Sequence, residues 1–193
     1  MGQSLAPSPG QQCVHVTVSG PDTPGITAAL TRAIAQNRAT LLDIEQVVVQ
    51  GSLTLCLLVG IDSTDGQSGN ESVLKDLLFA ATRMGLELRF RVLADVDPVR
   101  QRRHDQLHAV TAIGDSLDAE GVSLIAETLA EHQANIENIR QLSSNGLTSV
   151  EILCAFEGGE DEARNLRRSL VLRTGNRGID IAVQRENLTR RAK

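Results

Sequence analysis

The feature that most constrains the fold of this 193-residue chain is an internal repeat. At an offset of about 95 residues, the apolar pattern of the first half recurs in the second half. Leu30 falls on Ile125, Ile34 falls on Leu129, and the pair Ile44 and Gln46 falls on the pair Ile139 and Gln141. A period of this length is that of a small domain, so the sequence predicts two tandem domains with one fold.

Each copy alternates between strand-like and helical patterns in the same order. In the first copy, the turn GPDTPG at 20–25 separates a strand from a helix, and Gly51-Ser52 joins two strand-like segments as a hairpin. In the second copy, Asn145-Gly146 is the hairpin signal. The order in both is β-α-β-β-α-β. The predicted elements are 14–19, 26–37, 41–50, 53–61, 71–84 and 86–92, then 107–114, 121–133, 134–144, 147–156, 161–174 and 178–184.

This order is typical of an α+β fold made of two tandem ferredoxin-like βαββαβ domains. Each domain is expected to have a four-stranded antiparallel sheet with two helices on one face. The open sheet face and free edges favour association, so a homodimer is expected. The expected bounds are a flexible tail at 1–12, the first domain at 13–93, a charged linker at 94–106, the second domain at 107–185 and a C-terminal tail at 186–193.

Composition argues against nucleic acid and membranes as partners. The chain has a net charge of -5 and a pI near 5.4, and its only aromatic residues are three phenylalanines. No apolar run approaches the roughly 18 residues of a membrane span. Cys13, Cys56 and Cys154 lie inside strand-like runs, as buried reduced thiols do, and the N-terminus lacks the layout of a signal peptide. The expected location is therefore the cytoplasm.

The turn GPDTPG is the main candidate for a binding site. Asp22 or Thr23 can cap the helix that follows, and Pro24 supplies a preset φ just inside it. Gly25 leaves the backbone bare, so amides at the helix start can bind an anion such as an α-carboxylate. The Asp22 carboxylate can meet an ammonium group. The turn can therefore hold both charged ends of a free amino acid, but a strand-to-helix turn with a cap is also a common structural element.

The neighbouring strand and the second copy supply further candidates. Thr40 or Asp43 is expected to reach the side chain of the bound amino acid. The turn of the second copy, GDSLDAEG, keeps Gly114 and has Asp115 and Asp118 near it, but it lacks Pro-Gly.

Catalytic and metal sites are not expected in this chain. Asp95 and Asp97 imitate the paired aspartates of a phosphatase, but Asp97 precedes a proline, and too few residues separate this pair from Gly114 for a βαβ crossover. His104 and His108 are four residues apart, with no third ligand indicated for a metal ion. We expect no catalytic residues and no cofactor in these residues.

With its order of elements, its repeat and the turn GPDTPG, the chain resembles a tandem pair of ACT domains, the modules that sense small molecules in enzymes of amino-acid metabolism. Gly20, Asp22, Pro24 and Gly25 match the turn motif GxDxPG of that family. In the second copy, Gly114 and Asn135 match. The ligand-binding residues that the resemblance and the turn imply are Gly20, Asp22, Pro24, Gly25, Ile26, Thr40 and Asp43, with Gly114 and Asn135 in the second copy.

Two stretches, LLDIEQVVVQGSLTLCLLV and the terminal ENLTRRAK, resemble the regulatory half of bacterial phosphoserine phosphatases of the haloacid-dehalogenase type. The resemblance implies that the two domains bind L-serine, or another small amino acid, and dimerise. It implies an Mg²⁺-dependent phosphatase domain beyond the terminal stretch. A free-standing tandem regulator, like the repressor of the glycine cleavage system, is the alternative, and a scaffold that only dimerises the enzyme is a third.

Overall fold

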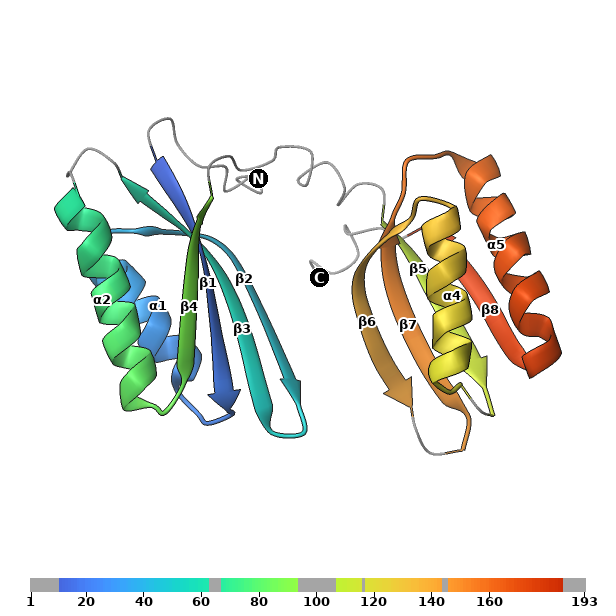
Figure 1. Cartoon of the computed structure of the whole chain (residues 1–193), viewed down its shortest axis with the longest axis horizontal. Coiled ribbons are helices and arrows are strands. Elements are labelled where there is room, and N and C mark those ends of the chain that lie inside the picture. The colour runs from blue at the N-terminus through green and yellow to red at the C-terminus, as the bar shows by residue number, and fades with distance from the viewer. Residues whose placement is uncertain (1–10, 63–66, 94–106, 116, 144–145, 186–193) are drawn as a thin grey trace, which may run out of the picture. The chain divides into compact units, whose positions relative to one another are not determined.

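The computed structural model describes residues 11–62, 67–93, 107–115, 117–143 and 146–185. It divides into two compact units, one within residues 1–96 and the other within residues 97–193 (Figure 1). The expected tails at 1–12 and 186–193 and the expected linker at 94–106 lie outside the described residues, except that strand β1 already begins at Gln11.

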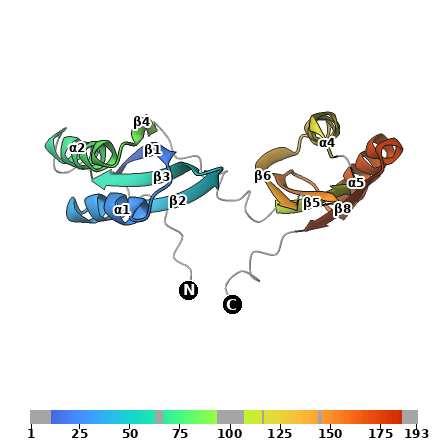
Figure 2. The same cartoon turned by 90° about the horizontal axis from the view of Figure 1, so that it is seen from below.

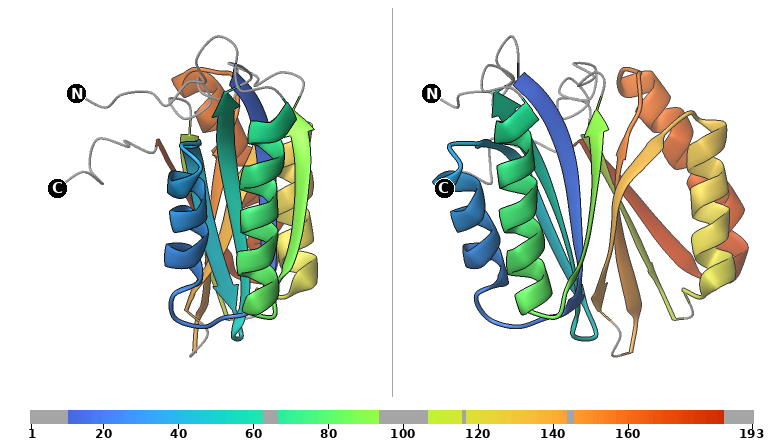
Figure 3. Two further views of the ribbon diagram at one scale, coloured as in Figure 1. Left: turned by 90° about the vertical axis from the view of Figure 1, so that its left-hand side faces the viewer. Right: turned by 60° about the vertical axis from the view of Figure 1, so that its left-hand side comes forward.

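The first unit has the expected order of elements. Its four strands pair antiparallel in the order β2-β3-β1-β4, and both helices cover one face of the sheet (Figure 3). The elements are β1 (Gln11–Pro21), α1 (Ile26–Gln36), β2 (Thr40–Val49), β3 (Ser52–Asp62), α2 (Gln67–Arg83) and β4 (Glu87–Leu93).

The second unit repeats this architecture with the strand order β6-β7-β5-β8. Figure 2 shows α4 and α5 side by side on one face of its sheet. The elements are β5 (Leu107–Gly114), α4 (Ala119–Glu131), β6 (Asn135–Ser143), β7 (Thr148–Ala155), α5 (Glu160–Thr174), the short helix η3 (Gly175–Arg177) and β8 (Ile179–Arg185). The two βαββαβ units confirm the predicted fold class.

Each unit has its own hydrophobic core between the sheet and the two helices. In the first unit, Leu30 of α1 and Leu77 of α2 are fully buried against the strands. In the second unit, Ile125 of α4 and Leu170 of α5 are buried at the corresponding positions. The alternation of β1 and β5 supplies one apolar face to this layer, and the 3.6-residue period of the helices supplies the other. The helical part of the repeat, Leu30 with Ile34 and Ile125 with Leu129, therefore lies in the two cores, whereas its strand residues Ile44 and Ile139 are exposed.

The first hairpin turns one residue earlier than the sequence predicts. Val49 pairs with Ser52, so the connecting residues are Gln50 and Gly51 and not Gly51-Ser52. Both have positive φ, 50° and 74°, as a type I′ turn requires. The sequence signal is ambiguous because glycine is favoured at either central position of such a turn. Part of the other predicted hairpin turn, Asn145-Gly146, lies outside the described residues.

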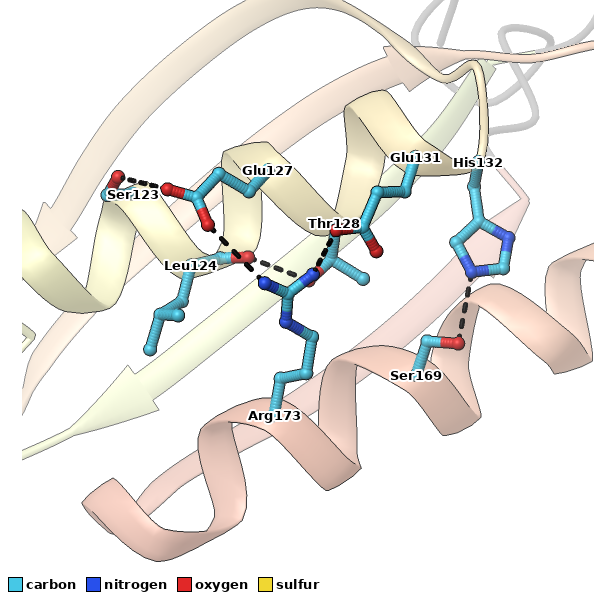
Figure 4. Close-up of polar contacts among 8 residues, drawn as sticks. All are labelled: Ser123, Leu124, Glu127, Thr128, Glu131, His132, Ser169 and Arg173. Carbon is cyan, nitrogen blue, oxygen red and sulfur yellow. Dashed lines mark hydrogen bonds and ion pairs between the residues drawn. The ribbon is translucent and has the colours of Figure 1, made fainter.

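Polar side chains join the two helices of the second unit (Figure 4). Arg173 of α5 donates to Glu131 at 2.6 Å and to Glu127 at 3.3 Å, both on α4. His132 Nε2 lies 3.0 Å from the Ser169 hydroxyl. These side chains form hydrogen bonds and ion pairs with one another across the helix pair. The cluster therefore stabilises the packing of α4 against α5.

In the described residues of the first unit, the polar contacts between the two helices involve a single side-chain amide, that of Asn37. Asn37, at the C-terminal end of α1, donates to Asp76 at 2.8 Å and accepts from the Ser72 hydroxyl at 2.7 Å, both on α2. Its amide also donates to the Ala33 carbonyl at 2.9 Å. The two units therefore share a fold, while their exposed polar contacts differ.

Candidate functional site

The turn 20–25 connects β1 to α1 at one end of the first sheet (Figure 1). The turn of the β2–β3 hairpin lies at the same end of the sheet. The backbone amide of Asp22 donates to the carbonyl of Gly51 at 2.9 Å. This bond ties the start of the turn to the tip of the hairpin. The turn is therefore held from both sides, by the sheet and by the helix.

Helix α1 begins without a side-chain cap. Its N-cap is Gly25, with φ of 96°, and the first backbone bond runs from the Ala29 amide to the Gly25 carbonyl at 2.9 Å. The expectation that Asp22 or Thr23 caps this helix is wrong, and Pro24 lies before the helix and not inside it. Left-handed φ is accessible to glycine without strain, so Gly25 can begin the helix where another residue would be strained.

The uncapped helix start faces a hollow of about 410 Å³. The amides of residues 26–28 have no acceptor inside the helix, and the positive end of the helix dipole lies behind them. Asp22 supplies the only carboxylate of the lining. The hollow is lined by Asp22, Thr23, Pro24, Gly25, Ile26, Thr27, Ala28 and Gln46. Amide donors and the Asp22 carboxylate therefore line the same hollow. A zwitterionic amino acid needs both, the donors for its carboxylate and the negative charge for its ammonium group.

Gln46 of β2 is the lining residue that the turn alone did not reveal. The Thr27 hydroxyl donates to Gln46 Oε1 at 2.7 Å. This bond leaves the Gln46 amide nitrogen as a donor beside the hollow. The signal for Gln46 was present in the repeat, since the pair Ile44 and Gln46 recurs as Ile139 and Gln141.

Thr40 and Asp43 lie on β2 but far from the turn. Gly20 pairs with Leu53 of β3, whereas Thr40 pairs with Gly60, so the two sites are about 23 Å apart along the strand. Asp43 is about 17 Å away by the same measure. Within one domain, the expectation that either residue reaches a ligand in the turn is wrong. Antiparallel pairing places the beginning of β2 at the opposite end of the sheet.

Gly20 serves the packing of the turn. A Cβ atom there would lie 2.7 Å from Leu86 Cδ2, and its φ of 154° is one that other residues rarely adopt. Leu86 is buried in the first core. Gly20 therefore lets the end of β1 pass close to the segment that leads from α2 into β4.

In the second unit, the start of α4 is capped. Its N-cap is Asp118, in an extended conformation, and Asp118 Oδ1 accepts from the Gly121 amide at 2.9 Å. Arg177 of η3 donates to the same oxygen at 3.2 Å and also pairs with Glu120. The hydrogen bond from Gly121, with the Arg177 charge beside it, holds the pKa of the Asp118 carboxyl below its usual value.

The two matched residues of the second unit are not brought together. Gly114 pairs with Thr148 near the beginning of β7, and Asn135 pairs with Ala155 at its end. The separation is about 23 Å along the strand. Their ligand-binding role stays a prediction, and within one domain they do not form a common site.

The other reactive side chains in the described residues do not form a metal-binding cluster. No three His, Cys, Asp or Glu side chains gather to hold a metal ion in the described part of the chain. Asp95, Asp97 and His104 lie outside it. Burial in the second core raises the pKa of the Cys154 thiol to about 11, which makes that thiol a poor nucleophile. No helix among the residues described is long and apolar enough to cross a membrane.

The family models that match this chain are both described as ACT domain, one over residues 12–91 and one over residues 106–184. These ranges coincide with the two βαββαβ units. The two matched ranges include the residues of both hydrophobic cores and the turn that precedes α1.

Two curated relatives are phosphoserine phosphatases. The enzyme of Streptomyces coelicolor is 34% identical over 178 residues, which is 92% of this chain and 41% of the relative. Phosphoserine phosphatase SerB2 of Mycobacterium tuberculosis is 31% identical over 188 residues, which is 96% of this chain and 44% of the relative. The chain therefore spans less than half the length of the curated relatives it matches.

Solved structures share the whole two-domain architecture. A protein of unknown function from Galdieria sulphuraria has a TM-score of 0.72 at 19% identity, over 92% of this chain and 99% of that one. A candidate glycine cleavage system transcriptional repressor has a TM-score of 0.66 at 15% identity, over 90% of this chain and 96% of that one. At these identities the likeness establishes the fold. The chain belongs to the ACT-domain family and consists of two ACT domains in tandem.

Proposed function

We propose that this chain is the regulatory, amino-acid-binding part of a phosphoserine phosphatase, and that L-serine binds to its first ACT domain. The two curated relatives at 31% and 34% identity support the link to the enzyme. The observation that carries the binding proposal is the uncapped start of α1, where amide donors and the Asp22 carboxylate line one hollow.

The amino acid binds through its charged ends. Its α-carboxylate accepts from the amides at the start of α1, helped by the helix dipole, and its ammonium group meets Asp22. The Gln46 amide nitrogen is placed to donate to a side-chain hydroxyl, which favours serine over alanine. Millimolar to micromolar affinity corresponds to about 4 to 8 kcal/mol, which a dipole-assisted carboxylate contact and an ammonium pair can supply.

The catalytic chemistry belongs to another domain of the proposed enzyme. The described residues include no cluster that could hold a metal ion. In this proposal, hydrolysis of O-phospho-L-serine and the Mg²⁺ ion that it uses are assigned to a separate catalytic domain, because the chain spans less than half the length of the phosphatases it matches. Serine regulates that domain only by as much as it prefers one arrangement of the ACT domains over another.

The chain also forms a homodimer through the edge strand β2 in this proposal. Ile44, Val47, Val48 and Val49 of this strand are all at least 42% exposed. By register, Ile44 and Val48 lie on the helix-covered face, and Val47 and Val49 lie on the open face. An edge strand that is apolar on both faces is stabilised by pairing with a second strand.

Titration calorimetry of the whole chain tests the binding proposal. We expect L-serine to bind, and we expect Asp22→Asn to weaken it at least tenfold because the ammonium group loses its counter-charge. The control is Asp115→Asn, an exposed aspartate near the corresponding turn of the second domain, which keeps full affinity. If L-serine, glycine, L-alanine and L-threonine all give no heat of binding, the binding proposal is wrong. The result would then support the hypothesis that the domains only dimerise the enzyme.

Sedimentation velocity tests the dimer. The double variant Val47→Lys, Val49→Lys puts two charges on the open face of the edge strand and should be monomeric. Leu172→Lys, on the exposed surface of α5, is the matched control and should remain dimeric. A dimeric edge variant would assign the interface to another surface.

The free-standing regulator remains the competing function, and the gene separates the two. An apolar strand followed by DxDST downstream of codon 193 supports the phosphatase. A stop codon at that position supports the regulator.

A further inference from the structure

The start of α4 occupies the place in the second domain that the binding hollow occupies in the first. The helices α1 and α4 superpose in sequence at the offset of about 95 residues that relates Leu30 to Ile125. Their C-terminal ends keep the same offset, because Arg38 and Gln133 both have positive φ, 56° and 55°. On this offset α4 begins two residues earlier than α1, so the helix starts are compared by counting from the N-caps Gly25 and Asp118. The third helical amide is then that of Ala28 in α1 and that of Gly121 in α4.

These two equivalent amides meet different groups. The Gly121 amide donates to the Asp118 carboxylate at 2.9 Å, whereas the start of α1 has no side-chain cap. A ligand carboxylate in the first domain and the Asp118 carboxylate in the second are thus the same chemical group at the same helix position. The correspondence rests on the function proposed above.

The second domain also supplies a cation to this carboxylate. Arg177 donates to Asp118 Oδ1 at 3.2 Å and pairs with Glu120, and its side chain is only 28% exposed. Arg177 comes from η3, at the opposite end of the domain sequence from Asp118. The charged group on the helix start is therefore fixed by two separate elements.

The corner around Gly121 is packed. A Cβ atom on Gly121 would lie 3.0 Å from Ile179 Cδ1 and 3.3 Å from Leu117 Cδ1. The equivalent corner of the first domain opens into the hollow of about 410 Å³. In the described residues, a hollow therefore lies beside the start of α1, whereas the Asp118 carboxylate occupies the start of α4.

We propose that Asp118 is a built-in occupant of the second domain: its carboxylate takes the position that the α-carboxylate of a bound amino acid takes in the first domain. The chain then binds one amino acid, in domain 1, and domain 2 stays closed. A group tethered next to its site has an effective concentration of millimolar or more, so millimolar amino acid does not displace it.

Amide chemical shifts of the whole wild-type chain test the occupancy directly. Saturating L-serine should shift the amides of residues 26–28 and leave that of Gly121 unchanged. A shift of Gly121 in parallel with Ala28 would overturn the inference. If no amide shifts, the proposed function fails, and the following variant experiment decides the inference independently.

The variant Asp118→Ala removes the internal carboxylate and leaves the Gly121 amide and Arg177 in place. It should lower the melting temperature of the second domain by about 5 °C. Sodium formate at 100 mM should restore most of this loss and shift the Gly121 amide, while sodium chloride at equal ionic strength should not. Wild type and Asp115→Ala, the matched control, should show neither formate effect.

Failure of formate to move either signal in Asp118→Ala would overturn the inference, because an emptied anion position should accept a small carboxylate. If this variant does not fold, Asp118→Asn serves instead, since asparagine keeps the cap. Its Gly121 amide should then ignore both formate and L-serine. A response of that amide to either probe would show that the corner is open.

Discussion

The first helices of the two ACT domains end alike and begin differently. At the end of α1, the Ala39 amide donates to the Ile34 carbonyl at 3.2 Å, and at the end of α4 the Ala134 amide donates to the Leu129 carbonyl at 2.8 Å. At the start, Gly25 leaves α1 uncapped, while Asp118 caps α4. The shared ends serve the turn into the next strand, whereas the starts differ in what they leave for a ligand.

The edge strands differ in the same direction. β2 carries four large exposed aliphatic side chains, while β6 carries two, Ile139 and Leu142, beside Arg140, which pairs with Glu151 of β7 at 2.6 Å. Charged residues on an edge oppose pairing with another strand. The first domain therefore has the uncapped helix start and the more apolar edge strand, whereas the second domain has a capped helix start and an ion pair on its edge strand.

Each domain has its own hydrophobic core, so truncating a core side chain should destabilise the domain that contains it. Leu30→Ala and Ile125→Ala each remove an equivalent, fully buried side chain and should destabilise by about 2 to 5 kcal/mol. Each variant should unfold its own domain first in a thermal melt followed by amide resonances. Loss of both domains together in either variant would show that the two units unfold as one.

Gly20 near the end of β1 and Gly114 at the end of β5 should differ in how strongly a larger side chain destabilises the fold. Gly20→Ala should destabilise by about 2 kcal/mol, because its Cβ meets Leu86 at 2.7 Å and its φ is 154°. Gly114→Ala should cost only about 1 kcal/mol, since its closest contact would be 3.1 Å. Urea denaturation of both variants measures the difference. Equal losses would mean that the two turns are equally tight.

Substitutions of the strand glutamines Gln46 and Gln141 should distinguish the proposed binding domain from the second domain. Gln46→Ala should weaken L-serine about fivefold by removing one neutral hydrogen bond worth about 1 kcal/mol. Gln141→Ala, at the repeated position, should leave the affinity unchanged. Titration calorimetry on the two variants gives the answer. An equal loss in both would place the ligand in contact with both domains.

Acid stability should differ between the two helix starts. The pKa of Asp118 is lowered in the folded state, so its contribution is full above the unfolded value of about 4 and is lost as the pH falls toward the folded value. The second domain of wild type should therefore lose more melting temperature between pH 5 and pH 2 than that of Asp118→Asn. Gly25 gives the first domain no such group. Parallel pH profiles for wild type and variant would contradict the assignment.

Much of the fold was predictable because its signals are local. The order of elements, the two cores and the turn follow from periods of 2 and 3.6 residues and from glycine and proline at the turn. The position of the first hairpin was wrong by one residue, since Gln50 at φ of 50° has no sequence signal. The helix cap was wrong for a related reason, because Gly25 takes a φ that its sequence neighbours do not reveal.

Sequence patterns alone predicted that two βαββαβ domains follow one another and that a turn rich in glycine and proline precedes the first helix. Which residues surround that turn depends on how the elements pack. Antiparallel pairing brings Gln46 beside it and carries Thr40 to the far end of the sheet, and η3 brings Arg177 onto Asp118. Side-chain periodicity is written within one segment, whereas strand register and contacts between distant elements arise only when the segments pack together.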